Sequence, residues 1–158
     1  MTKDELNQLF TYKNGELFWN LPRKKIKVGN KAGSVISKGY ESICLNQKRY
    51  YTHRLIFMMF YGYMPKEIDH IDGNSLNNRI ENLRESNRNS NMQNTKLSKL
   101  NTSGYKNVYW HNATHQWKVQ LNANKKRIFI GSFDDLELAG LVAQEARNKY
   151  HKEFARHI

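Results

Sequence analysis

Hydrophobic and polar residues alternate with a period of two over much of the N-terminal half, which indicates short β-strands. Asn14-Gly15 stands between aromatic runs and predicts a hairpin, and strands are expected over 39–46 and 48–55. Two segments have a helical pattern instead. One follows the capping-box spacing of Thr2 and Glu5, and the other is a buried helix ending near Gly62.

The C-terminal third predicts three more strands and a final helix. The strands are the runs "YKNVYWHN", "QWKVQLN" and "KRIFIGSF", and the helix follows a cap at Asp134 or Asp135. Its apolar stripe consists of Ala139, Val142, Ala143, Ala146 and Tyr150. The polar linker before these strands places a domain boundary near residue 100, which gives domains 1–100 and 101–158 and an α+β fold class.

The charge of the chain points to a polyanionic partner. Its 158 residues carry a formal net charge of +12, and the excess is six on residues 1–94 and six on residues 95–158. An even distribution fits two compact basic units better than one basic tail. Hydrophobic residues make up 39% of the chain, which is enough for packed cores.

The single cysteine, Cys44, excludes an intramolecular disulfide and a Cys-rich zinc site, and we expect it to be buried. The longest strongly apolar run is too short to span a bilayer, and the N-terminus has no secretory segment. The sequence therefore predicts a cytoplasmic protein.

Residues 69–83, "DHIDGNSLNNRIENL", do not read as one helix or strand, because asparagine amides compete for backbone hydrogen bonds. A strand ending in Asp69-His70, a turn at Asp72-Gly73, a second short strand and the polar segment after Leu83 predict a ββα unit. In such a unit a carboxylate and a helix side chain hold a divalent cation beside a histidine. Phosphodiester cleavage needs these parts, namely a base for water and a cation for the departing oxygen.

This stretch resembles the HNH endonuclease family, especially its phage and intron-homing branch. The matching motifs are "HRLIF", "DHIDGNSLNNRIENL" and "NRNSNMQN", together with "GELFW", "KGYESICLN" and "YYTHRL", over roughly residues 1–95. The resemblance implies a ββα-metal domain with an N-terminal small β-sheet. It also implies that Asp69 is a metal ligand, that His70 is the general base, and that Asn82 ties the loop between the strands to the backbone.

The resemblance further places the second metal ligand at Asn91, with Asn87, Asn89 and Asn94 as alternatives. The amide oxygen suits Mg²⁺ or Mn²⁺ and serves zinc poorly, so we expect one such ion per active site. Arg54 is a candidate to grip a phosphate, although a packing and capping role is equally compatible with the sequence. His53 is a weaker candidate.

Alternation assigns two faces to the three C-terminal strands. One face would pack on the helix and includes Val108, Trp110, Trp117, Val119, Leu121, Ile128 and Ile130. The other face is basic, polar and aromatic, and carries Tyr109, His111, Lys118, Gln120, Asn122, Arg127 and Phe129. A β-sheet can enter a major groove, where Arg and Gln read base edges and Lys contacts phosphates.

The same region resembles the plant APETALA/ethylene-response DNA-binding domain over about residues 103–157. The matches are "SGYKNVYW", Trp117, "IGSF", the Ala-rich helix and "KEFA". The plant pattern has Arg where Tyr109 and His111 stand, so its base preference is not transferable. The resemblance implies a three-stranded antiparallel sheet packed on one helix.

Together these features predict a Mg²⁺-dependent HNH endonuclease of nicking or homing type, acting on double-stranded DNA as a monomer or weak dimer. With one catalytic motif, a monomer should nick one strand. The main alternative is a non-catalytic DNA-binding regulator that retains the HNH fold. An RNA-binding accessory protein is also compatible with the charge.

Overall fold

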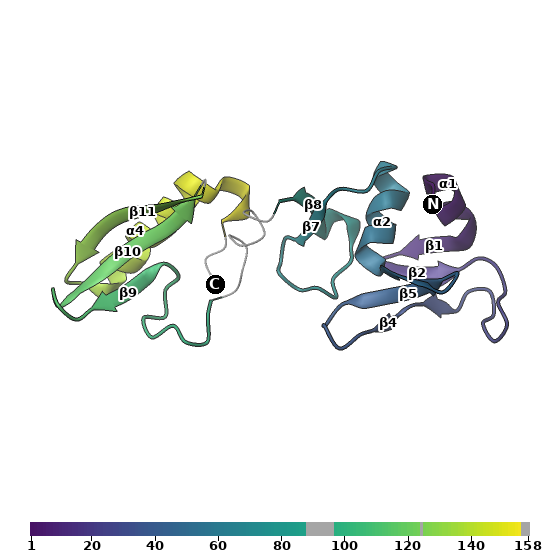
Figure 1. The fold of residues 1–158 in the computed structure, drawn as a ribbon, viewed down its shortest axis with the longest axis horizontal. Coiled ribbons are helices and arrows are strands. Elements are labelled where there is room, and N and C mark those ends of the chain that lie inside the picture. The colour runs from purple at the N-terminus through teal and green to yellow at the C-terminus, as the bar shows by residue number, and fades with distance from the viewer. Residues whose placement is uncertain (88–96, 124, 156–158) are drawn as a thin grey trace. The chain divides into compact units, whose positions relative to one another are not determined.

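The computed structural model describes residues 1–87, 97–123 and 125–155, and the chain forms two compact units, Met1–Asn87 (unit 1) and Arg88–Ile158 (unit 2) (Figure 1). Small sheets and helices occur in both units, which agrees with the expected α+β class. The boundary between the two units falls between Asn87 and Arg88, whereas the polar linker in the sequence predicted a domain boundary near residue 100. The helix predicted directly after Leu83 is wrong at its start, because Leu83–Ser86 is a strand, and the rest of that segment from residue 88, with the predicted ligand Asn91, lies outside the described residues.

Unit 1 begins with α1 (Lys3–Leu9), and the predicted capping box at its start is confirmed. The Thr2 hydroxyl accepts from the Glu5 N–H, and the Glu5 carboxylate accepts from the Thr2 N–H. The predicted hairpin is also present, with β1 (Phe10–Lys13) paired antiparallel to β2 (Glu16–Trp19). Asn14 and Gly15 have positive φ angles of 50° and 88°, as the tight turn requires.

The remaining elements of unit 1 form small sheets around one central helix. They are β3 (Lys31–Ala32), β4 (Ser34–Val35), β5 (Glu41–Leu45), β6 (Lys48–Tyr51), α2 (Thr52–Tyr61), β7 (Glu67–His70), η1 (Ile80–Asn82) and β8 (Leu83–Ser86). The sheet orders are β1-β2-β3, β4-β5-β6 and β7-β8. Figure 1 shows α2 between the β7–β8 hairpin and α1.

The core of unit 1 lies around α2, which ends at Gly62 in a left-handed conformation as the sequence predicted. Leu55, Ile56 and Phe57 of α2 are buried together with apolar side chains of α1, β1, β2 and β5. The expectation that Cys44 is buried is wrong. Its neighbours Ile43 and Leu45 face the core, so alternation along β5 turns Cys44 to the exposed side.

Unit 2 contains β9 (Val108–His111), β10 (Gln116–Ala123), β11 (Lys126–Phe133), α4 (Leu136–His151) and η2 (Lys152–Phe154). The sheet is antiparallel with β10 in the centre. Asp135 caps α4, because its carboxylate accepts from the Leu138 N–H at 2.6 Å. Val119 and Leu121 pack with Ala139, Ala143 and Ala146, so the small residues of α4 let the helix lie close to the sheet.

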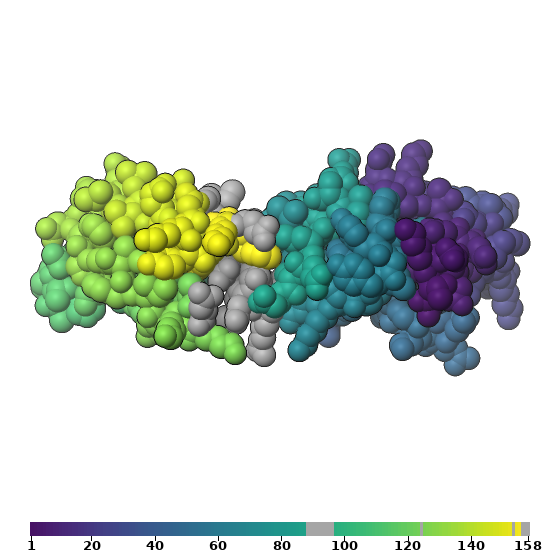
Figure 2. Space-filling view, turned by 90° about the horizontal axis from the view of Figure 1, so that it is seen from above, coloured from purple at the N-terminus to yellow at the C-terminus, as the bar shows by residue number. Residues whose placement is uncertain are grey.

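The predicted apolar stripe of α4 is partly wrong, because Tyr150 is exposed. The polar residues Arg147 and His151 are the buried side chains in the last turns of the helix. The Arg147 guanidinium donates to the Lys106 carbonyl at 2.6 Å, and His151 Nε2 lies 3.0 Å from the Asn122 carbonyl. These bonds make the burial of two polar side chains tolerable. In Figure 2 the yellow atoms, which include part of α4, form part of the surface of unit 2.

Across the described ranges, none of the helices combines the length and apolar character needed to cross a bilayer.

Candidate functional site

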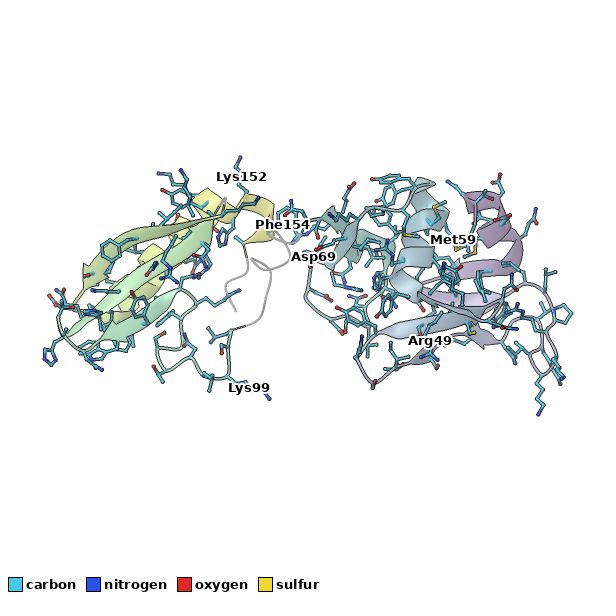
Figure 3. The ribbon with its side chains drawn as sticks, in the orientation of Figure 1. Arg49, Met59, Asp69, Lys99, Lys152 and Phe154 are labelled. Carbon is cyan, nitrogen blue, oxygen red and sulfur yellow. The ribbon has the colours of Figure 1, made fainter. Side chains whose placement is uncertain are left out.

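Asp69 and His70 stand at the end of β7 and are both buried, with 9% and 6% of their surface exposed. Figure 3 labels Asp69 on this strand. The strand pairs with β8 so that Asp69 lies opposite Arg84 and His70 opposite Leu83. Because successive strand residues point to opposite faces, the carboxylate and the imidazole have different neighbours.

Asn82 holds the loop that joins the two strands. Its side-chain oxygen accepts from the Asp72 N–H at 3.0 Å, and its Nδ2 donates to the Asn77 carbonyl at 2.8 Å. The Asp72 carboxylate accepts from the Asn74 N–H and the Asn77 amide, as a turn residue does. Partial burial opposes ionisation of Asp72, but the hydrogen bonds from Asn77, Asn74 and Asn82 prevail and lower its pKa.

The His70 ring is bonded on one side to a buried asparagine. Its Nε2 lies 3.1 Å from Asn78 Oδ1, and Asn78 is only 2% exposed. The Asn78 amide nitrogen faces Glu41 Oε2 at 3.5 Å. Glu41 is in turn paired with Lys31 at 3.2 Å, and Lys31 also binds Glu16 at 2.6 Å. Hydrogen bonds from Lys31 to Glu16 and then to Glu41 raise the pKa of Lys31.

His53 lies against His70 and is held neutral. The two rings meet edge to face with centroids 5.0 Å apart, and His53 also stacks on Tyr51. Burial, followed by the charges of His70 and Arg54, lowers the pKa of His53 to about 3. Its Nδ1 is buried without a hydrogen-bond partner among the residues described, so a charged ring would be costly there. His53 therefore forms an uncharged wall beside His70.

The Asp69 carboxylate forms an ion pair with Arg84 across the hairpin. Arg84 donates to Asp69 Oδ2 from Nε at 3.0 Å and from Nη2 at 2.8 Å. A carboxylate beside a histidine is the donor type that a hard cation such as Mg²⁺ takes, since this ion keeps several waters and needs few protein ligands. Within the described ranges, no group of three or more His, Cys, Asp or Glu side chains could hold a metal.

Arg54 has bonds that stabilise the chain around Pro65. Its guanidinium donates to the Pro65 carbonyl at 2.9 Å and to the Lys66 carbonyl at 3.4 Å. These contacts fix the segment between α2 and β7, which places the beginning of β7. The role of Arg54 in gripping a phosphate stays a prediction.

The seven outward candidates of unit 2 share one face of its sheet. The register pairs Tyr109 with Lys118, Gln120 with Phe129, and Asn122 with Arg127, while His111 pairs with Gln116. Tyr109 and Phe129 are 42% and 58% exposed, although both are aromatic. The Tyr109 hydroxyl donates to Gln120 Oε1 at 3.1 Å, so part of this face is already ordered. We call these seven residues the outer face.

The other face follows the predicted assignment with one difference. Trp110 pairs with Trp117 in the register and contacts its ring, but it is 40% exposed. Trp110 lies near the end of β9. The buried residues Ala139 and Ala143 of α4 pack on Val108 and Val119 and not on Trp110.

Sequence reasoning did not identify Asn78, Glu41 and Arg84 as site residues. Asn78 stood in the asparagine-rich stretch, which was a usable signal, but its partner Glu41 is 37 residues away. Arg84 becomes visible only through the β7–β8 register, which places it opposite Asp69.

Comparison with known proteins agrees with this geometry. An HNH endonuclease family model matches residues 50–93, the segment that contains β7, the asparagine-rich loop and β8. Protein 3.8 of Escherichia phage T7 is 31% identical over 144 residues, which cover 91% of this chain and 97% of the phage protein. No solved structure gives a significant match. The similarity to Protein 3.8 thus extends over both units, so the chain belongs to the same family as this phage protein, and residues 50–93 carry an HNH endonuclease domain.

Proposed function

We propose that this protein is a divalent-metal-dependent DNA endonuclease with His70 as general base. The observation that carries the proposal is the placement of His70. It is buried at the end of β7, adjacent to Asp69, with one ring nitrogen held by Asn78. This arrangement stands within the segment that the HNH endonuclease model matches.

In the proposed reaction, His70 accepts a proton from the attacking water. Among the described residues, Asp69 would be the ligand of the cation. Asn91 is the proposed second ligand and lies outside them. A bound Mg²⁺ or Mn²⁺ would supply charge stabilisation for the departing 3′ oxygen. Asn82 holds the loop between β7 and β8 in place through its side-chain bonds. His53 is neutral and so adds no positive charge beside the base. The products are a 5′-phosphate and a 3′-hydroxyl.

The outer face of unit 2 is proposed to bind duplex DNA in the manner of an APETALA/ethylene-response-type domain. Arg127 and Gln120 have the chemistry to read base edges, and Lys118 has the chemistry to contact a phosphate. Exposed Tyr109 and Phe129 supply apolar contacts on the same face. The remaining two residues of the outer face, His111 and Asn122, are proposed to take part in recognition.

One active site per chain supports a nicking or homing type of cleavage by a monomer or weak dimer. The relative from a phage supports a role in the cytoplasm of an infected bacterium.

The Asp69–Arg84 ion pair favours a second candidate, a non-catalytic DNA-binding regulator with an HNH fold. A guanidinium bound to Oδ2 occupies a carboxylate that the enzyme needs for its cation. For the enzyme, the cation has to compete with Arg84. For the regulator, Arg84 replaces the cation permanently and stabilises the hairpin.

Supercoiled plasmid distinguishes the two candidates. The enzyme should convert it to the nicked form with Mg²⁺ or Mn²⁺, and a chelator should stop the conversion. Asp69→Ala should lower the rate, whereas Arg84→Ala should leave nicking in place and lower the Mg²⁺ concentration needed. Binding of plasmid without nicking in either metal would support the regulator.

A further inference from the structure

The loop that faces His70 is held by the N-terminal sheets at several points. The Ser75 hydroxyl donates to the Gly39 carbonyl at 2.6 Å, and the Tyr12 hydroxyl accepts from the Ile80 N–H at 3.1 Å. The turn between β1 and β2 also touches the loop closely. A Cβ at Gly15 would lie 2.8 Å from the Arg79 nitrogen, so only glycine allows this approach.

At the centre of these contacts, Asn78 connects His70 to Glu41. Asn78 and Glu41 are both buried, at 2% and 6% exposure, and Lys31 pairs with the carboxylate from the solvent side. An ionised carboxylate only accepts hydrogen bonds. The Asn78 amide must therefore turn its nitrogen toward Glu41, because the reverse orientation would bring two acceptors together.

The orientation of Asn78 determines which nitrogen of His70 carries the proton. With its nitrogen toward Glu41, Asn78 presents Oδ1 to His70, and Oδ1 can only accept. The His70 Nε2 must then be the N–H donor of the neutral ring, and Nδ1 keeps the lone pair. A general base needs an unprotonated nitrogen aimed at its water, and the bond made by the other nitrogen sets this tautomer.

We propose that Asn78 is a positioning residue that fixes the tautomer and ring orientation of His70, and that Glu41 and Lys31 set the direction of its amide. The small N-terminal sheets would then serve the active site, because they supply the carboxylate, the lysine and the turn that hold Asn78. The inference rests on the proposed function for its catalytic consequence, but the tautomer itself is a property of the protein without metal or DNA.

The test uses the full-length protein and two readouts. The first is the tautomer of His70 in ¹⁵N-histidine-labelled protein, measured by NMR without metal or DNA and assigned with His70→Ala. The second is the single-turnover nicking rate at saturating DNA, measured together with DNA affinity. The variants are Asn78→Ala and the nearly isosteric Glu41→Gln. The control is Asn77→Ala, because this neighbouring side chain bonds Asp72 instead of His70.

Wild type should show His70 only as the Nε2–H tautomer. Asn78→Ala should give a mixture and reduce the single-turnover rate by about 10- to 100-fold with little change in affinity, as for other residues that orient a catalytic group. Glu41→Gln should also give a mixture with a smaller rate loss, because a glutamine amide accepts either orientation of Asn78. Asn77→Ala should leave the tautomer unchanged.

The proposal is overturned if both Asn78→Ala and Glu41→Gln keep the pure Nε2–H tautomer, or if they lower affinity while the single-turnover rate stays within about twofold of wild type. Failure of wild type to nick DNA is a separate result that rejects the proposed endonuclease. In that case the NMR measurement still decides whether Asn78 fixes the His70 tautomer.

Discussion

Unit 1 and unit 2 use their polar side chains in opposite ways. In unit 1, Asp69, His70 and Asn78 are buried and each has a specific partner in the protein. In unit 2, Asn122 and Arg127 are exposed on a sheet face, next to the exposed ring of Phe129. Chemistry on a phosphodiester requires groups held in one orientation and away from bulk water. Recognition of a large anion requires exposed groups that reach outward.

The burial of polar groups at the site of unit 1 has a structural cost that the outer face of unit 2 avoids. A buried polar group costs free energy unless it is bonded, so Asp69, His70 and Asn78 need partners within unit 1. This explains Asn78 and Asn82 of the loop, which are buried and bond to His70 and to the Asp72 N–H, whereas Asn74 is exposed and bonds within its turn. Unit 2 leaves the polar groups of its outer face to solvent, and its buried Arg147 and His151 bond to backbone carbonyls of Lys106 and Asn122.

The largest effect is expected from His70. His70→Ala should reduce the nicking rate by about 10²- to 10⁴-fold, the usual contribution of a general base, while DNA affinity changes little. Single-turnover nicking and a binding titration without Mg²⁺ measure the two quantities separately. His115→Ala is the matched control, because His115 is exposed in the turn before β10 of unit 2. Nicking by His70→Ala at the wild-type rate would remove His70 from the site.

The second effect tests the two faces of unit 2. Leu121 is 1% exposed and packs with Ala123 and Ala146, so Leu121→Ala should destabilise this unit by about 2–5 kcal/mol. Asn122, the next residue, is exposed on the outer face, and Asn122→Ala should change stability by no more than about 0.5 kcal/mol. Urea denaturation followed by tryptophan fluorescence gives both values. Equal destabilisation by the two changes would contradict the division into a core face and an outer face.

The third effect is a pH dependence that belongs to unit 1. The pKa of His53 is about 3 in the folded protein, well below the ordinary value of 6.5. Below pH 6.5 the unfolded chain therefore binds a proton that the folded chain does not, and stability falls as the pH falls from 6.5 toward 3. Between pH 7 and pH 5 this loss should amount to about 2 kcal/mol.

His53→Phe should remove this dependence, because phenylalanine does not titrate and can still stack on Tyr51. The measurement is the difference between urea unfolding free energies at pH 7 and pH 5 for wild type and variant. Burial also lowers the pKa of His151 in unit 2, but that histidine is present in both proteins and cancels in the comparison. An equal pH dependence in the two proteins would show that His53 is not buried as described.

Local features of the fold were predictable because their causes are local. The capping box at Thr2, the Asn14-Gly15 hairpin and the cap at Asp135 each depend on residues within a few positions of one another. The β9–β11 faces followed from alternation alone. Burial of Arg147 was not predictable, since it depends on a loop carbonyl at Lys106, 41 residues away.

The site, too, divides into residues with local signals, which were predictable, and residues that depend on contacts far apart in the sequence, which were not. Asp69, His70 and Asn82 have a recognisable spacing in one stretch of sequence. Arg84 depends on the β7–β8 register across a long loop, and Glu41 depends on a contact between β5 and that loop. A two-residue turn fixes register, but the loop 71–82 does not, so side-chain bonds within it have to do so.

The smallest effects are expected on the outer face, where Arg127 and Lys118 should behave differently. Arg127→Ala should weaken binding of a preferred site by about 1–3 kcal/mol, if its guanidinium contacts a base, and should change unrelated sequences less. Lys118→Ala should weaken all sequences similarly and flatten the dependence of log K on log salt by about one unit, the contribution of one phosphate contact. Titrations of selected and random duplexes at several salt concentrations give both quantities. Identical effects of the two changes on selected and random duplexes would mean that the outer face of unit 2 contacts DNA only through charge, and that site preference arises elsewhere in the chain.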